Sequence, residues 1–75
     1  MMRITVRLFA TLRTNRFKED TREYPAGTTV AQVADDLKIF SGELALILVN
    51  GHTASFDQEL NDNDILSLFP PVGGG

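Results

Sequence analysis

The first hydrophobic pattern in the chain is an alternation near its start. Apolar residues at positions 4, 6 and 8 alternate with polar residues at positions 3, 5 and 7, and this period of two is typical of a half-buried strand. The polar stretch 11–20 predicts a connecting loop. The short β-prone run from Thr21 to Tyr24 predicts a second strand, which stops at the turn cluster Pro25-Ala26-Gly27. We therefore expect an N-terminal hairpin with a long, charged connection.

A single helix is predicted after this turn. Thr29 and Gln32 have the spacing of a capping box, in which each side chain accepts a hydrogen bond from a free backbone N–H group. Apolar residues recur at i, i+3, i+4 and i+7 from Val30 to Leu37, so one apolar stripe lies on a single helix face. Gly42 is expected to end the helix, which would be about ten residues long.

The second half of the chain predicts two further strands. The run Leu44 to Val49 is apolar throughout and ends at Asn50-Gly51. A strand that is apolar on both faces is either covered twice or leaves one face for a partner. Because one helix covers only one sheet face, the uncovered side is a candidate interface; a central strand edged by loops is the alternative. A last strand, Ile65 to Phe69, follows the loop 57–64, with a minor strand expected near 53–56.

These elements predict the order β-β-α-β-β, an α+β fold in which a mixed sheet packs on one helix. We assign residues 1–70 to this domain and residues 71–75 to a flexible, glycine-rich C-terminal tail. Pro70-Pro71 favours extended polyproline geometry at the start of the tail. At about 3.4 Å per residue, the tail could reach roughly 17 Å.

The last three residues, Gly73, Gly74 and Gly75, make up half of the six glycines in the protein. Glycine lets a backbone enter a narrow channel, and it leaves a terminal carboxylate open to attack. Such a carboxylate must be activated before acyl chemistry, and adenylation by ATP is the usual means. The alternative is a disordered end or an expression scar.

Composition excludes several classes of function. The chain has 75 residues, which allow one domain. It has no cysteine, which excludes disulfides, thiolate metal sites and a cysteine nucleophile. The acidic residues between 57 and 64 lack the glycine and the closing glutamate of a calcium loop. With one histidine and two lysines besides, the composition favours a binding or carrier module with no metal and no bound cofactor over an enzyme.

Charge is distributed unevenly along the chain. The formal net charge is −3, but residues 1–24 carry six basic side chains against three acidic ones. An acidic protein is not expected to bind nucleic acid. The arginine cluster is either a local basic patch or a solvated strand face and loop. No apolar run approaches the 18 residues of a membrane span, and the N-terminus lacks a signal-peptide core. We therefore expect no membrane association and a cytoplasmic location.

Five segments of the chain carry a family resemblance: Leu8 to Arg13, Pro25 to Val30, Val49-Asn50-Gly51, Leu60 with Asp62 and Asp64, and Phe69-Pro70-Pro71-Val72 followed by Gly74-Gly75. In these segments the sequence resembles the MoaD/ThiS family of sulfur carriers, which are small ubiquitin-like β-grasp proteins. The last segment is the most specific and looks more like the MoaD branch than the ThiS branch. Two positions depart from the family pattern: Asn63 replaces a usual glycine, and Gly73 replaces a different small residue.

The resemblance implies a mechanism. An E1-like adenylyltransferase would use ATP to adenylate the carboxylate of Gly75, and sulfur from a persulfide would displace AMP and leave a thiocarboxylate. The large catalytic subunit of molybdopterin synthase would then accept the tail and transfer its sulfur to a pterin precursor. Gly73 and Gly74 would thread the partner's channel. The expected docking residues are Phe9, Phe69, Pro70, Pro71 and Val72, with Phe9 or Phe69 partly exposed.

Three alternatives stay open on the sequence. The chain could carry sulfur for a thiazole synthase in thiamine biosynthesis, or for another sulfur product. It could be a ubiquitin-like modifier whose Gly75 forms isopeptide bonds with lysines. It could also be a plain β-grasp interaction domain in which the terminal glycines have no role.

Overall fold

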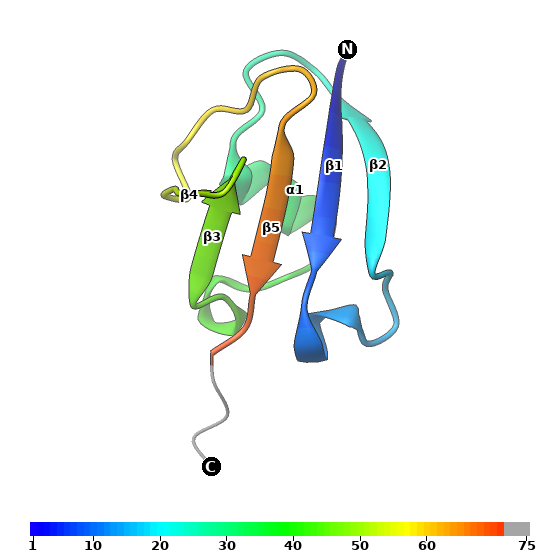
Figure 1. Cartoon of the computed structure of the whole chain (residues 1–75), viewed down its shortest axis with the longest axis vertical. Coiled ribbons are helices and arrows are strands. Elements are labelled where there is room, and N and C mark those ends of the chain that lie inside the picture. Colours follow the sequence, from blue (N-terminus) through cyan, green and yellow to red (C-terminus); the bar gives the residue numbers. More distant parts are fainter. Residues whose placement is uncertain (72–75) are drawn as a thin grey trace.

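The computed structural model describes residues 1–71, and the predicted tail residues Val72 to Gly75 lie outside the described residues. Five strands form one sheet in the order β2-β1-β5-β3-β4, and the helix α1 covers one of its faces (Figure 1). The elements, in chain order, are β1 (Met2–Leu8), a 3₁₀ helix (Ala10–Arg13), β2 (Glu19–Tyr24), α1 (Val30–Asp36), a second 3₁₀ helix (Ser41–Glu43), β3 (Leu46–Val49), β4 (His52–Thr53) and β5 (Ile65–Phe69).

The first and last strands lie side by side in the middle of the sheet. β1 and β5 are parallel, whereas β1 with β2, β3 with β5, and β3 with β4 are antiparallel. The predicted α+β architecture, with a mixed sheet packed on one helix, is confirmed. The parallel pair has a further consequence, because parallel neighbours point the same way and therefore end at the same edge of the sheet.

The core lies between the sheet and α1. Ile4, Val6 and Leu8 of β1 are completely buried, as the alternation predicted, and the residues between them face the opposite side of the sheet. From α1, Val30 and Val33 are equally buried. Residues 1–71 contain one α-helix, so within this part of the chain the other face of the sheet is uncovered.

The start of α1 was predicted correctly and its end was not. The Thr29–Gln32 capping box is present, with Gln32 N–H donating to the Thr29 hydroxyl and Thr29 N–H to the Gln32 side chain. The helix, however, ends at Asp36, well before Gly42.

Lys38 makes the turn that ends the helix, with a left-handed φ of 59°. Its N–H donates to the Asp35 carbonyl, and Ile39 N–H donates to the Ala34 carbonyl, both at 2.9 Å, which is the hydrogen-bond pattern of a Schellman motif. The turn directs Ile39 into the core, where it is only 4% exposed. Burial of Ile39 therefore favours an early end to the helix. Gly42 lies in the second 3₁₀ helix instead.

The remaining elements differ from expectation mainly in their bounds. β2 begins at Glu19, and the loop before it contains the 3₁₀ helix whose Leu12 is buried at 1% exposure. β3 begins at Leu46 rather than Leu44. The minor strand β4 is His52–Thr53. It follows directly on the turn Asn50-Gly51, whose two residues both have positive φ and close a two-residue hairpin. No helix in residues 1–71 is long and apolar enough to cross a membrane.

Candidate functional site

Two phenylalanines lie together at the ends of the central strands. β1 and β5 are in register with Leu8 opposite Leu68, so the residues that follow, Phe9 and Phe69, are neighbours. Their rings stack with centroids 4.1 Å apart and planes 11° apart. Phe9 N–H also donates to the Leu68 carbonyl at 3.2 Å, which holds the backbone past the end of β1. Both rings are half-buried, so each leaves part of its surface to solvent.

An apolar groove of about 550 Å³ opens at this end of the sheet. On its far side, Leu46 is 40% exposed and pairs with Phe69 in the β3–β5 ladder. Four of the five predicted docking residues line this groove, and the fifth, Val72, lies outside the described residues together with Gly73, Gly74 and Gly75. The residues that line the apolar groove are Phe9, Ala10, Thr11, Ala45, Leu46, Phe69, Pro70 and Pro71.

The apolar groove lies where the chain leaves the sheet. Ala45, directly before β3, donates its N–H to the Phe69 carbonyl at 2.9 Å. This is the last hydrogen bond between the β3 segment and β5. Neither Pro70 nor Pro71 has an N–H to donate, so the ladder ends there. Figure 1 shows the chain passing out of the sheet at this edge, beyond the end of β5. The apolar groove therefore lies at the base of the segment that leaves the sheet at Pro70 and Pro71.

The uncovered face of β3 adds to this apolar surface. The burial of β3 alternates, with Ile47 and Val49 buried against the helix side and Leu46 and Leu48 facing the open side. β3 has β5 on one side and only the two-residue β4 on the other. The uncovered side expected for this strand is therefore present, and Leu48 lies on it two residues along from Leu46, which lines the apolar groove.

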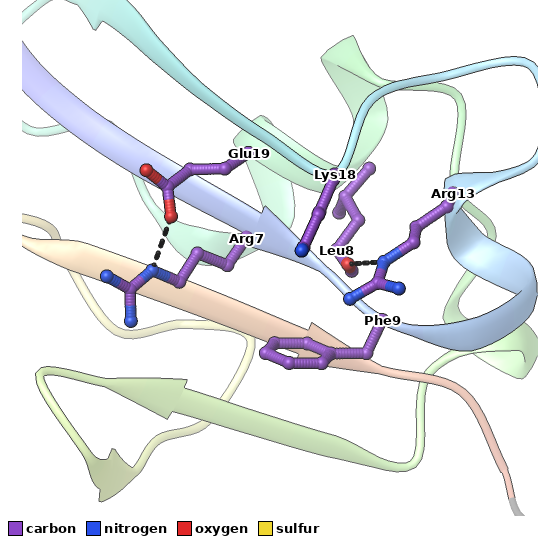
Figure 2. A pocket seen from close by; sticks show the side chains of 6 residues that line it. All are labelled: Arg7, Leu8, Phe9, Arg13, Lys18 and Glu19. Atoms are coloured by element: carbon purple, nitrogen blue, oxygen red, sulfur yellow. Dashed lines mark hydrogen bonds and ion pairs between the residues drawn. The ribbon is translucent and has the colours of Figure 1, made fainter.

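A second, basic pocket of about 220 Å³ lies beyond Phe9 (Figure 2). Arg13 extends over the Phe9 ring, with its guanidinium carbon 5.6 Å from the ring centroid, and its Nε donates to the Leu8 carbonyl at 2.8 Å. Arg7 forms an ion pair with Glu19 at 2.8 Å. Lys18 completes the pocket. We call these residues, Arg7, Leu8, Phe9, Arg13, Lys18 and Glu19, the basic pocket.

The basic pocket contains three of the six basic residues of 1–24. The sequence left open whether the arginine cluster in this part of the chain is a local basic patch or a solvated strand face and loop. The basic residues of the loop between β1 and β2 were the sequence signal for this pocket. The sequence did not predict the 3₁₀ helix in this loop, which brings Arg13 back over Phe9.

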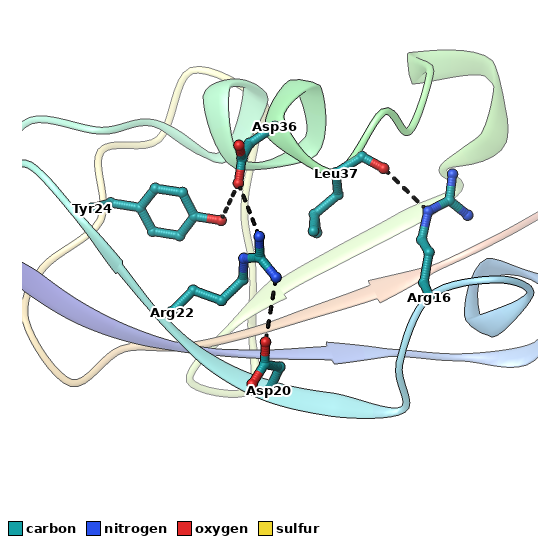
Figure 3. A network of polar contacts seen from close by, with 6 residues as sticks. All are labelled: Arg16, Asp20, Arg22, Tyr24, Asp36 and Leu37. Atoms are coloured by element: carbon teal, nitrogen blue, oxygen red, sulfur yellow. Dashed lines mark hydrogen bonds and ion pairs between the residues drawn. The ribbon is translucent and has the colours of Figure 1, made fainter.

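Two other arginines serve a network on the helix side of the sheet (Figure 3). Arg16 donates to the carbonyls of Leu37 at 3.1 Å and Lys38 at 3.0 Å, so it binds the C-terminal end of α1. Arg22 contacts the Asp36 carboxylate at 3.5 Å, and the Tyr24 hydroxyl donates to the same carboxylate at 3.0 Å. These contacts fasten the helix to β2 and to the loop before it, and their residues do not line the apolar groove.

Burial and charge shift two pKa values in this network. Burial raises the pKa of the Tyr24 hydroxyl, and its hydrogen bond to Asp36 raises it further. For Arg22, burial lowers the pKa, but the Tyr24 hydroxyl and the nearby carboxylates of Asp36 and Asp20 outweigh it, so the pKa is raised. Neither group lines the apolar groove or the basic pocket, so we attribute both shifts to the structural network.

A third polar cluster aligns the start of β5. The buried Asp64 accepts hydrogen bonds from the Asn50 side chain and from Asn61 N–H, each at 2.8 Å, and Ile65 N–H donates to Asn50 at 2.8 Å. Asn63, which stands in place of the usual glycine, has φ of 69°, the left-handed turn expected for it. In the described part of the chain, no three His, Cys, Asp or Glu side chains come together as metal ligands.

Comparison with known proteins gives one family and a set of similar structures. The model of the ThiS family matches residues 6–75, and no curated protein matches the chain. A putative molybdopterin converting factor, subunit 1, from Pyrococcus furiosus is 29% identical, with a TM-score of 0.79 over 96% of this chain and 100% of that one. This likeness confirms the predicted ubiquitin-like β-grasp fold.

Two further structures share the fold at lower identity. The small archaeal modifier protein 1 of Haloferax volcanii is 21% identical, with a TM-score of 0.78 over 96% of this chain and 100% of that one. A chain in the complex of subunits 1 and 2 of the molybdopterin-converting factor from Helicobacter pylori is 24% identical, with a TM-score of 0.66 over 99% of this chain and 100% of that one.

Proposed function

The chain belongs to the ThiS family, and we propose that it is a non-catalytic sulfur carrier that supplies molybdopterin biosynthesis in the cytoplasm through a thiocarboxylate on Gly75. The proposal rests on one observation: two features occur at the same end of the chain. The family match extends through Gly75, and the apolar groove lies at the base of the segment that ends there. A carrier needs only a surface that its partners recognise and a terminus that they can reach.

The proposed loading chemistry uses the chain's own carboxylate. An oxygen of the Gly75 carboxylate attacks the α-phosphorus of ATP on an E1-like adenylyltransferase, and pyrophosphate leaves. The terminal sulfur of a partner's persulfide then attacks the carbonyl carbon, and AMP leaves. A second thiol cleaves the S–S bond, which releases the thiocarboxylate and forms a disulfide. The chain has no cysteine, so both thiols belong to partners.

The groove supports docking of the large subunit of molybdopterin synthase. The half-buried Phe9, Phe69 and Pro70 form, with the exposed Pro71, a mostly apolar surface of the kind that anchors a partner's side chain. The likeness to the Pyrococcus furiosus factor and to the Helicobacter pylori complex of subunits 1 and 2 supports the molybdopterin pathway over thiamine thiazole synthesis. In this proposal Val72, Gly73 and Gly74 pass into the channel of the large subunit.

Intact-mass spectrometry tests the loading step. The full chain is incubated with an E1-like adenylyltransferase from the same genome, ATP and a persulfide donor, and we expect the mass increase of one oxygen replaced by sulfur. Deletion of Gly75 should abolish the increase. Gly42→Ala is the matched control, because a side chain at Gly42 meets no atom within 4 Å. A wild-type chain that keeps its oxygen, or whose cellular role survives deletion of Gly74 and Gly75, contradicts the proposal.

A ubiquitin-like modifier is the second candidate. The fold fits the Haloferax volcanii modifier as well as the Pyrococcus furiosus factor, with TM-scores of 0.78 and 0.79. A modifier would appear in cell extracts as a ladder of conjugates through Gly75, whereas a carrier would appear at its own mass. Adding the loaded chain to the large subunit and a pterin precursor, or to a thiazole synthase, then identifies the sulfur acceptor.

A further inference from the structure

We infer that the basic pocket binds a carboxylate side chain of the protein that docks in the apolar groove, which in the proposed function is the large subunit of molybdopterin synthase. This inference rests on the proposed function for the identity of the partner. It adds the chemistry of the partner's surface: an apolar anchor with an acidic residue beside it.

The charge of the basic pocket is opposite to that of the whole protein. The chain carries a formal charge of −3, yet the pocket lining combines Arg7, Arg13 and Lys18 with a single acidic residue, Glu19. Arg7 and Glu19 form an ion pair at 2.8 Å and neutralise each other. The positive charge that is left belongs to Arg13 and Lys18, for which the described residues show no carboxylate partner.

The donors of Arg13 are held in place by other contacts. Its Nε donates to the Leu8 carbonyl at 2.8 Å, and the guanidinium lies over the Phe9 ring. The terminal nitrogens therefore remain for a ligand, on a side chain that has already lost most of its freedom. Figure 2 shows the amine of Lys18 and the guanidinium of Arg13 pointing toward the space that they line together. Binding a partner therefore costs little further side-chain entropy at Arg13.

A carboxylate side chain suits these donors. The planar fork of arginine matches a carboxylate with two parallel hydrogen bonds, and Arg13 and Lys18 are the pocket cations for which the described residues show no carboxylate partner. Because the pocket adjoins the apolar groove through Phe9, the anion that reaches it on docking is a side chain of the partner protein rather than a free phosphate. The pocket volume of about 220 Å³ is enough for one acidic side chain.

Phe9 connects the pocket to the apolar groove, since its ring lines both. A partner side chain that fills the groove against Phe9 and Phe69 therefore places its neighbouring residues beside Arg13. Docking in the groove also removes water from the edge of the pocket, which strengthens the attraction between the cations and a carboxylate. The partner's carboxylate thus fixes how its anchor is oriented on the sheet end.

The test measures binding of the full chain to the large subunit from the same genome by calorimetry, at about 50 and 200 mM salt. We expect Lys18→Gln and Arg13→Gln each to weaken binding by about 5- to 30-fold at the lower salt, with a smaller effect at the higher salt. Lys38→Gln and Arg3→Gln are the matched controls, because they remove the same charges away from the pocket. They should leave binding within about twofold.

Three results overturn the inference even where the wild-type chain binds the large subunit. If Phe9→Ala abolishes binding but the Lys18 and Arg13 variants bind as wild type, the groove acts alone and the proposed function stands. If the controls weaken binding as much as the pocket variants, net charge is responsible and the pocket is not a site. If inorganic phosphate shifts the amide resonances of Lys18 and Arg13 at micromolar concentration, the pocket is a phosphate site.

A wild-type chain that does not bind the large subunit at all also overturns the inference, and it removes this partner from the proposed function. The mass-spectrometric loading experiment then separates the two failures. Conversion of Gly75 to a thiocarboxylate without binding to this subunit would keep the carrier and change only its acceptor.

Discussion

The rings of Phe9 and Phe69 stack 4.1 Å apart at the ends of two parallel strands from opposite ends of the chain. Each ring depends on the other for its position, because the two residues follow directly on the paired Leu8 and Leu68. The pair forms the wall of the apolar groove from which the chain leaves the sheet. Docking at this edge and the stability of the central strands are therefore coupled.

Replacing either ring should reveal this coupling. Phe9→Ala and Phe69→Ala should each lower the free energy of unfolding by about 1–2 kcal/mol, because each removes a half-buried ring from the stack. The double variant should lose less than the sum by about 0.5–1.5 kcal/mol. Urea unfolding followed by circular dichroism measures all three. Phe40→Ala is the control: this ring is 77% exposed, and its loss should cost under about 0.5 kcal/mol. Strict additivity would contradict the coupling.

The Asp64 cluster should be essential for stability. Asp64→Ala leaves Asn61 N–H and the Asn50 side chain without their partner, and we expect the free energy of unfolding to fall by about 2 kcal/mol. Asp57→Ala, at an exposed position of the preceding loop, should change it by less than about 0.5 kcal/mol. Equal losses in chemical denaturation would mean that Asp64 acts through general surface charge.

The end of α1 can be improved. Lys38 holds a left-handed conformation that is unfavourable for a residue with a Cβ. Lys38→Gly should therefore raise the free energy of unfolding by about 0.5–1 kcal/mol, net of the entropy that glycine adds to the unfolded chain. Gly42→Ala should leave stability unchanged or raise it, since Gly42 has no left-handed φ and no close neighbour. A thermal melt that moves in the opposite order would show that the helix ends elsewhere.

Alkaline pH should weaken the attachment of α1 to β2. The pKa of Tyr24 is raised in the folded protein by burial and by its hydrogen bond to Asp36, so the folded state favours the neutral hydroxyl. The resulting stability is fully present below about pH 10, the ordinary tyrosine value, and is lost as the pH rises through the folded pKa. Tyr24 is the only tyrosine, so tyrosinate absorbance measures its pKa directly.

Tyr24→Phe is the matched variant for this titration. It should lose about 1 kcal/mol at neutral pH with the hydrogen bond to Asp36, and its stability should fall less above about pH 10 than that of the wild type. Parallel pH profiles for the two proteins, or a tyrosinate pKa at the ordinary value, would contradict this role of Tyr24.

Local chemistry allowed several elements to be predicted closely. The Thr29–Gln32 capping box, the Asn50-Gly51 turn and the strand Ile65–Phe69 each depend on neighbours within a few residues, and all three are present as expected. The end of α1 was predicted wrongly because it depends on the burial of Ile39 against the core, which a local glycine signal does not report.

The sequence by itself determined the order of the strands and the helix, where the helix begins and that the chain carries three glycines at its end, after a Pro-Pro pair, because periodicity, capping and turn preferences act over short distances. Only the tertiary structure decided that β1 and β5 lie side by side, and hence that Phe9 meets Phe69 and Arg13 covers Phe9. Pairing between strands so far apart in the chain is governed by the burial of the whole sheet against α1. No local pattern contains that information.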